Sequence, residues 1–210
     1  MAKLTLSSNT TDFTIYLTSP IKLDNKQHEA AFVSLHTYNS LPNITEDNNK
    51  FKYSNDNGIS WKIIEIPKGA YEFHDINSWI QNEMQLNGDY DEENNKYYIG
   101  MNYYKWTFKT ILDISDSKYM VDFGVENSVA STLGFKNEKL SNGIHRSSNS
   151  INIEKVNSIL VHCDIITGTY VNDNKSRVIY NFTPRVSPGY KIIERPSPEL
   201  IFLPVVQKPN

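Results

Sequence analysis

The amino-acid sequence predicts an all-β fold, a sandwich or barrel of antiparallel strands with one or two short helices inserted. Short runs in which apolar and polar residues alternate recur along the 210 residues, as they do in strands with one buried face. Loop signals separate these runs at spacings of about 8–15 residues, which does not fit a helix after every strand. No Gly/Ser-rich or Pro-rich linker divides the chain, so we expect a single domain over residues 1–210.

The first third of the chain contributes two strand regions and a hairpin. Leu4–Leu17 alternates apolar with polar residues, and His28–Tyr38 continues the pattern. Phe51–Tyr53 and Ser60–Ile66 flank the tripeptide Asp-Asn-Gly, which favours a tight turn between antiparallel strands.

One segment has the period of a helix. His74–Leu86 follows a Pro-x-Gly turn and places apolar residues at steps of four, with Asp75 as the expected N-cap and Asn87-Gly88 as the expected stop. Its apolar face is formed by Ile76, Ile80 and Met84, with Trp79 beside them.

Strands resume after this helix and continue to the end of the chain. A short helix from Asn127 or Ser128 to Leu133, ended by Gly134, interrupts them. Asn137–Ser150 is expected to be a polar loop. The expected strands are Lys96–Met101, Trp106–Ile114, Tyr119–Phe123, Asn157–Ile166, Val178–Phe182, Tyr190–Ile193 and Leu200–Val205.

The composition argues against binding to nucleic acid or insertion into a membrane. The formal net charge is −3, and Lys and Arg are scattered, so no specific nucleic-acid partner is expected. The N-terminus lacks the apolar stretch of a signal peptide, and no apolar run is long enough to span a membrane. We therefore expect an intracellular protein.

No residue pattern predicts catalysis, a cofactor or a metal site. None of the five histidines has a metal-binding spacing, and the single cysteine, Cys163, cannot build a thiolate zinc site. Asn87–Lys96 has the composition of a calcium loop but lacks its central glycine and its final glutamate. We expect that segment to be a solvated hairpin tip, and the protein not to be an enzyme.

The aromatic stretch Tyr97–Trp106 leaves a second function open. Its rings are able to stack on sugars or bases, although tyrosines at adjacent positions lie on opposite faces of a strand, as sandwich packing alone requires. Exposed tyrosines and Asn-rich loops would suit a β-sandwich ligand-binding or attachment module of the lectin type. This is the alternative to a structural protein.

Four segments, in this order and spacing, resemble the penton (minor capsid) protein of Polinton/Maverick elements and adintoviruses. The resemblance covers residues 4–206, and each motif by itself is weak. The segments are Leu17–Thr45, Ile66–Met84 with its IPKGAY turn, Ser131–Phe135 (STLGF), and the closing region from VNSILVHCDIITGTYVND to PGYKIIERPSPELIFLPV.

The resemblance implies a single jelly-roll sandwich of two antiparallel sheets. It also implies a structural virion protein that forms homopentamers at the icosahedral vertices, beside a double-jelly-roll major capsid protein. Such a subunit would be located in the virion capsid and needs no active site. Family members continue beyond the strand that matches Leu200–Val205, so the resemblance implies a missing final strand and an open sheet edge at this segment.

Prolines concentrate in the closing segment, RVSPGYKIIERPSPELIFLPVV. Proline has a fixed φ and no N–H, so it marks bends and sheet edges. The resemblance suggests a stiff subunit-interface loop, which would lose little entropy when a neighbour docks. Protection of a sheet edge against aggregation explains the prolines equally well. The candidate interface residues are Pro188, Gly189, Tyr190, Pro196 and Pro198.

Overall fold

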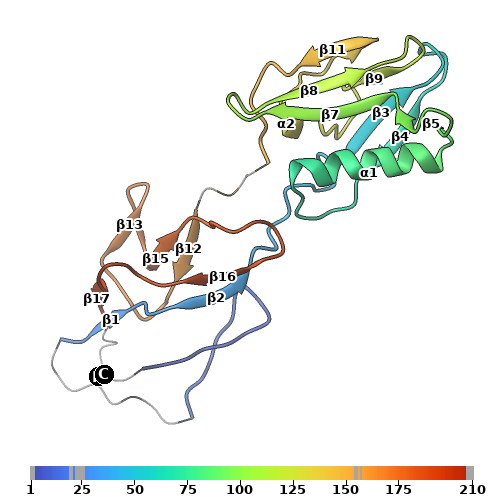
Figure 1. Ribbon diagram of the computed structural model, residues 1–210. Helices are drawn as coiled ribbons and strands as arrows, with labels where there is room; N and C mark the ends of the chain where they lie inside the picture. Colours follow the sequence, from blue (N-terminus) through green and yellow to red (C-terminus); the bar gives the residue numbers. More distant parts are fainter. Residues whose placement is uncertain (1–2, 19–20, 22–26, 154–155, 157, 207–210) are drawn as a thin grey trace.

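The computed structural model describes residues 3–18, 21, 27–153, 156 and 158–206. Most of its regular structure is β-strand, the paired strands are antiparallel, and two helices lie within the described residues. The all-β class is therefore confirmed. Figure 1 shows two groups of elements: a central unit, residues 43–153, and a flanking unit built from both ends of the chain, residues 3–42 and 156–206.

The central unit contains two sheets and both helices. One sheet has the strand order β10-β9-β3-β4 and the other β11-β8-β7, with the small hairpin β5–β6 beside them. Its elements are β3 (Lys50–Ser54), β4 (Lys62–Glu65), α1 (Phe73–Leu86), β5 (Tyr90–Asp91), β6 (Lys96–Tyr97), β7 (Ile99–Tyr104), β8 (Lys109–Ile114), β9 (Met120–Asp122), α2 (Ala130–Leu133), β10 (Lys139–Leu140) and β11 (Gly143–Arg146).

The core of the central unit is continuous. Alternate residues of β3, β7 and β8 point into it, as the period of two predicts, and α1 and α2 add their apolar faces. Aromatic rings fill the space between the elements: Phe51 packs edge-on against Phe123, which stacks on Phe135. Within the described residues, the buried hydrophobic side chains outside this core are Ile166, Phe182 and Ile192.

Helix α1 covers the open edges of both sheets. The Asn77 Oδ1 accepts a hydrogen bond from the Met101 backbone N–H (2.8 Å), and the Gln81 Nε2 donates to the Ile99 carbonyl (3.3 Å). On the other sheet, the Trp79 Nε1 donates to the Glu65 carbonyl (3.2 Å). These side chains occupy the backbone groups that a further strand would otherwise pair, so α1 protects the edges of β7 and β4.

A single side chain joins the two ends of the central unit. Asn43 is buried; its Nδ2 donates to the Tyr71 carbonyl (2.7 Å) and to the Ile153 carbonyl (3.2 Å), and its Oδ1 accepts from the Tyr71 N–H. The chain therefore enters and leaves this unit at one place, although 110 positions separate Asn43 from Ile153.

Three expectations for the central unit need correction. The N-cap of α1 is Glu72, and Asp75 instead accepts from the Glu72 N–H (2.8 Å). Residues 105–108 form a turn, so Trp106 and Phe108 do not belong to β8. The expected polar loop at residues 137–150 contains the strands β10 and β11.

The flanking unit pairs the two ends of the chain. β1 and β2 together run antiparallel to β17 and β16, and β12 pairs with β15. Its strands are β1 (Glu29–Ala31), β2 (Leu35–Tyr38), β12 (Ile159–His162), β13 (Thr169–Val171), β14 (Asn174–Ser176), β15 (Val178–Phe182), β16 (Lys191–Glu194) and β17 (Phe202–Pro204).

Two expectations for the flanking unit also change. The strand expected at Leu4–Leu17 is wrong, because residues 3–18 form no ladder with any described residue. The strand expected at Asn157–Ile166 is shorter, and Asn157 lies outside the described residues. The single jelly-roll connectivity over residues 1–210 stays a prediction.

Candidate subunit interface

A tight turn begins the proline-rich closing segment. Pro188 and Gly189 occupy its two central positions, Gly189 has φ of +82°, and the Tyr190 N–H donates to the Ser187 carbonyl (3.2 Å). Pro followed by a glycine of positive φ is the signature of a type II turn. Asn39 anchors the turn: it exchanges backbone hydrogen bonds with Gly189 and Tyr190, and its side chain donates to the Val186 carbonyl (2.7 Å).

The second group of prolines lies in an excursion between two strands. β16 pairs with β2 up to Glu194↔Leu35, and β17 resumes with β1 at Phe202↔Ala31. Residues 195–201 therefore lie opposite residues 32–34. Pro196 and Pro198 occur within this excursion, where no ladder requires their missing N–H. These two prolines thus fall where the pairing is interrupted, whereas Pro204 lies within β17.

The five candidate interface residues lie in two places on this ladder. Pro188, Gly189 and Tyr190 form the turn before β16, and Pro196 and Pro198 lie beyond its other end. Tyr190 is 67 % exposed and Pro196 is half-buried. Both places are at the surface of the chain, so contact of either with a neighbouring subunit stays a prediction.

The sequence predicted an open sheet edge at Leu200–Val205, and this prediction is wrong for the second half of that segment. On one side β17 pairs with β1, and the Val205 N–H donates to the His28 carbonyl (2.9 Å). On the other side the Pro204 carbonyl accepts from the Thr167 N–H (3.0 Å), and the Val206 N–H donates to the Ile165 carbonyl (2.8 Å). Residues 204–206 therefore have backbone partners on both sides, and the second side is supplied by residues 165–167. Phe202 and Leu203 pair with β1 alone among the described residues.

A small aromatic cluster joins β15 to Phe32, which lies opposite the proline excursion, and to the end of β16. Phe32 stacks on Tyr180 at 4.5 Å between ring centroids, and Tyr180 stacks on Phe182 at 6.3 Å. The Tyr180 hydroxyl donates to the Glu194 carboxylate (3.0 Å). Burial and this carboxylate together raise the pKa of Tyr180.

Large apolar side chains are exposed over much of the flanking unit. Ile201 is 66 % exposed, Phe202 47 % and Ile193 55 %, and all three belong to the closing segment. The exposed set in the flanking unit is Leu4, Leu6, Phe13, Ile15, Tyr16, Leu17, Ile21, Val33, Tyr38, Leu41, Val156, Leu160, Ile165, Tyr170, Val186, Tyr190, Ile193, Leu200, Ile201, Phe202 and Val206. Contiguous apolar surface is typical of sites that contact another molecule, and such a contact for this set stays a prediction.

The acidic stretch at residues 87–96 forms the expected hairpin, β5–β6, with a turn at residues 92–95. Its first carboxylate, Asp89, is buried instead of solvated. It accepts hydrogen bonds from the Tyr53 hydroxyl (2.5 Å), the Asn55 Nδ2 (2.6 Å) and the Lys62 Nζ (2.6 Å). Because every contact is made to the protein itself, this network fixes the hairpin against β3 and β4.

No group of three or more His, Cys, Asp or Glu side chains suited to a metal ion occurs among the residues that the structure describes. Within the same residues, no helix is long and apolar enough to cross a membrane. Cys163 is half-buried and not in a disulfide.

Sequence patterns missed a groove beside α1, on the outer face of β7, β8 and β11. Gly100 lies at its centre, and Gln81 and Asp113 lie on either side. The isolated Gly100 within a strand pattern is the signal that could have indicated it, because such a residue often marks a place where another group approaches the backbone.

Comparison with known proteins gives one structural similarity. The crystal structure of SeMet-labeled mavirus penton protein superposes with a TM-score of 0.42 at 13% sequence identity, covering 88% of this chain and 77% of that one. No protein-family model matches the chain, and no curated protein matches it.

Proposed function

We propose that this chain is a structural virion protein, a penton (minor capsid) subunit that forms homopentamers at icosahedral vertices beside a double-jelly-roll major capsid protein. The observation that supports this proposal most is the unequal burial of the two units. The central unit holds a continuous core, whereas the flanking unit buries few hydrophobic residues and exposes many.

The total surface of the chain supports the same proposal. The chain exposes 14598 Å², whereas a compact monomer of 24.2 kDa is expected to expose about 10,000 Å². An obligate interface buries roughly 2,000–5,000 Å² in total. The excess is therefore of the size that association with neighbouring copies removes.

The N-terminal segment is a further source of interface. Its residues alternate as in a strand, yet residues 3–18 have no ladder partner among the described residues, and Leu6, Phe13 and Tyr16 are exposed. A strand-like segment with unpaired backbone groups pairs readily with another chain. We propose that the edge of a neighbouring copy supplies this partner.

The closing segment would form the other side of the contact. Its turn and its excursion are held by Asn39 and by the two ladder pieces, so they are ordered before a neighbour arrives. Ordering in advance reduces the entropy lost on association. We propose that Pro188, Gly189, Tyr190, Pro196 and Pro198 form a rim loop of the pentamer, located in the virion capsid.

Light scattering of the purified chain over about a hundredfold range of concentration tests this proposal, because association depends on mass action. We expect a species near five chain masses that grows with concentration. Ile201→Asp, in the exposed closing segment, should weaken it. Ile59→Asp is the matched control, since Ile59 is 85 % exposed but lies on the central unit between β3 and β4.

Two results would argue against the proposal. A monomer at every concentration excludes assembly of the isolated chain, and failure to join particles of a double-jelly-roll major capsid protein would then overturn the capsid role. Equal loss of the pentamer in both variants would show that the flanking unit is not the contact surface. A lectin-like attachment module, the second candidate, predicts a monomer or dimer.

A further inference from the structure

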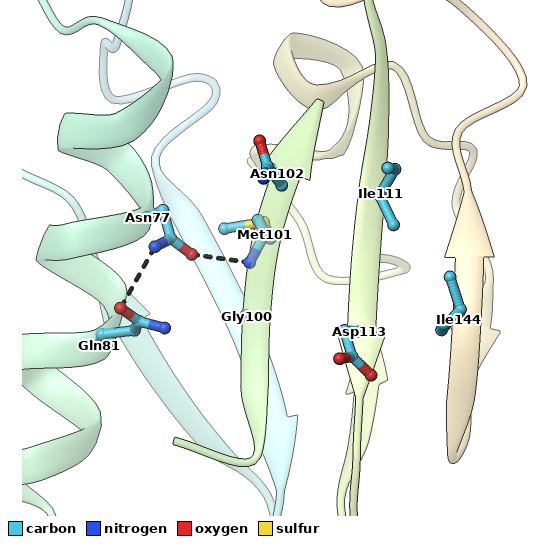
Figure 2. Close-up of a pocket in the computed structure, with 8 residues that line it drawn as sticks. All are labelled: Asn77, Gln81, Gly100, Met101, Asn102, Ile111, Asp113 and Ile144. Atoms are coloured by element: carbon cyan, nitrogen blue, oxygen red, sulfur yellow. Dashed lines mark hydrogen bonds between the residues drawn. The ribbon is translucent and has the colours of Figure 1, made fainter. Parts of the chain in front are cut away.

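A groove of about 370 Å³ runs between α1 and the outer face of the sheet β7-β8-β11. Figure 2 shows Asn77 and Gln81 on the helix side, Gly100 and Asn102 on β7, and Asp113 on β8. The groove is a surface feature of the central unit, on the side of the sheet that faces away from the core.

Gly100 creates the space at the centre of the groove. The residues that alternate with it on β7, Ile99 and Met101, point into the core. A Cβ at Gly100 would lie 3.7 Å from the Gln81 Nε2, an ordinary contact, so the fold has room for a larger residue here. Glycine is unfavourable inside a strand. Its presence therefore has no packing reason and leaves the backbone open to a ligand.

The polar side chains of the helix wall are held in place. The Asn77 Oδ1 accepts from the Met101 N–H, and the Asn77 Nδ2 donates to the Gln81 Oε1 (3.2 Å). The Gln81 Nε2 donates one of its two hydrogens to the Ile99 carbonyl (3.3 Å). Because these contacts fix the orientation of the Gln81 amide, its second N–H remains as a positioned donor.

The opposite wall supplies acceptors. Asp113 pairs directly across from Gly100 in the β7–β8 ladder, and its carboxylate makes no hydrogen bond or ion pair with any residue that the structure describes. Asn102 uses its Oδ1 to accept from the Tyr103 N–H (2.8 Å), which leaves its Nδ2 as a donor. The groove thus combines free donors with one carboxylate acceptor.

Apolar surface lies beside these polar groups. Ile144 pairs with Asp113 in the β8–β11 ladder and is 71 % exposed, and Ile111 lies on the same face. Two positions beyond Asn102 on β7, Tyr104 continues the outer face; the Arg146 guanidinium lies 5.0 Å from its ring centroid and donates to its hydroxyl (3.1 Å).

We propose that this groove binds a neutral oligosaccharide. A sugar hydroxyl donates to a carboxylate while it accepts from an amide N–H, which is the combination that Asp113, Gln81 and Asn102 offer. The C–H faces of the sugar ring suit Ile144 and Tyr104. One saccharide unit would lie over Gly100 and the next would extend along β7 towards Tyr104.

Other ligand classes fit the groove less well. The described residues that line the groove itself include no Lys or Arg, and the Arg146 guanidinium beyond it is engaged by the ring and hydroxyl of Tyr104, so a phosphate in the groove lacks a counter-charge. An added peptide strand has no access to the backbone of β7 at Ile99 and Met101, because Asn77 and Gln81 occupy those groups. A lysine-rich peptide paired with Asp113 is the competing possibility, and the experiment distinguishes it.

Saturation-transfer NMR on the whole chain tests the proposal. The probes are lactose, maltotriose, cellotriose and chitotriose, each at about 10 mM, so that a site with a Kd of about 1 mM is largely filled. We expect transfer to at least one of them. Gly100→Val, which fills the groove with a residue suited to strands, and Asp113→Asn should each weaken its affinity at least about tenfold. Ile63→Ala, on the outer face of β4, is the matched control and should leave the affinity unchanged.

The thermal midpoint of each variant establishes that it is folded, and Asp113→Asn carries the test if Gly100→Val does not fold. No transfer to any of the four sugars overturns the proposal, and so does affinity that survives in the folded variants. Binding of a lysine-rich peptide that depends on Asp113 and weakens with salt, without sugar binding, would identify a cation site instead. A pentamer that forms normally while the sugars fail to bind would separate this result from the capsid proposal.

Discussion

Replacing Gly134 by Ala should destabilise the central unit far more than the same change at Gly88. Both glycines follow a helix and have positive φ, +80° and +75°. A left-handed conformation costs a residue with a Cβ about 1–2 kcal/mol, so this part of the penalty is shared. The two sites differ in the space around them, which makes Gly88→Ala a matched control.

The extra cost at Gly134 follows from a close backbone approach. A Cβ there would lie 2.3 Å from the Asn149 carbonyl oxygen and 3.0 Å from that of Ser150, whereas nothing lies within 4 Å at Gly88. Residues 147–152 cannot move away freely. The Asn149 N–H donates to the Gly134 carbonyl (3.0 Å), and the Ser147 hydroxyl donates to the Asn149 carbonyl (2.7 Å). Each hydrogen bond lost costs about 1 kcal/mol, so we expect about 3–4 kcal/mol in total.

Urea unfolding followed by tryptophan fluorescence measures this difference. All three tryptophans, Trp61, Trp79 and Trp106, belong to the central unit, so the signal reports on the unit in which both glycines lie. We expect the two variants to differ by about 2 kcal/mol in the free energy of unfolding. Variants that agree to within about 0.5 kcal/mol would refute the close approach of residues 149–150 to Gly134.

Three further outcomes are expected. Residues 43–153 expressed alone should unfold at the urea midpoint of the whole chain, because their core is continuous and Asn43 joins their ends; a non-cooperative transition would contradict this. Hydrogen bonds from Ser60 lower the pKa of Asp56 to about 2. The contribution of the Asp56 carboxylate to folding stability should therefore be lost as pH falls from about 4 to 2, and Asp56→Asn should lose less stability over this range. Burial raises the pKa of Tyr119 to about 12. Stability should therefore fall between about pH 10 and 12, and Tyr119→Phe should flatten that fall.

The sequence predicted the elements whose residues carry their own pattern. α1 was recognised from its apolar steps of four, and β3, β4, β9 and β15 from alternation beside turn residues. The STLGF motif has a structural reason: Leu133 is buried, Gly134 ends α2, and Phe135 stacks on Phe123. Local patterns of this kind fix which face of an element is buried, and the structure agrees with them.

The predictions that failed concern which segments pair or pack with one another, and a single sequence does not show this. Leu4–Leu17 has the alternation of a strand, but no ladder partner exists within the described chain. The hairpin β13–β14 escaped notice because its turn, Asn172-Asp173 with φ of +48° and +62°, interrupts no clear apolar pattern. Asp89 was expected in solvent, and its burial depends on Tyr53 and Lys62, distant in sequence.

Proline content located the candidate interface in the sequence but did not show which segments pair with it. The turn at Pro188-Gly189 depends on Asn39, and the excursion at residues 195–201 depends on a ladder with residues 29–38. Both are contacts between segments that the central unit separates along the chain. Pro188, Pro196 and Pro198 therefore indicated where pairing is interrupted, although Pro204 lies within β17, while the partner segment came from the three-dimensional structure.

The hydrogen bonds that Asn43 makes with Tyr71 and Ile153 favour formation of the central unit before the flanking unit. Without the central unit, pairing Glu29 with Pro204 closes a loop of about 175 residues. Once Asn43 holds Ile153, the effective loop shortens to about 65 residues, which lowers the closure cost by about 0.9 kcal/mol. The central unit therefore favours the flanking ladder. That ladder still buries few apolar side chains of its own. Under the proposed capsid role, we expect contacts with neighbouring copies to supply the remaining stabilisation of the flanking unit. Folding of the flanking unit and association of copies are, on this reasoning, coupled steps.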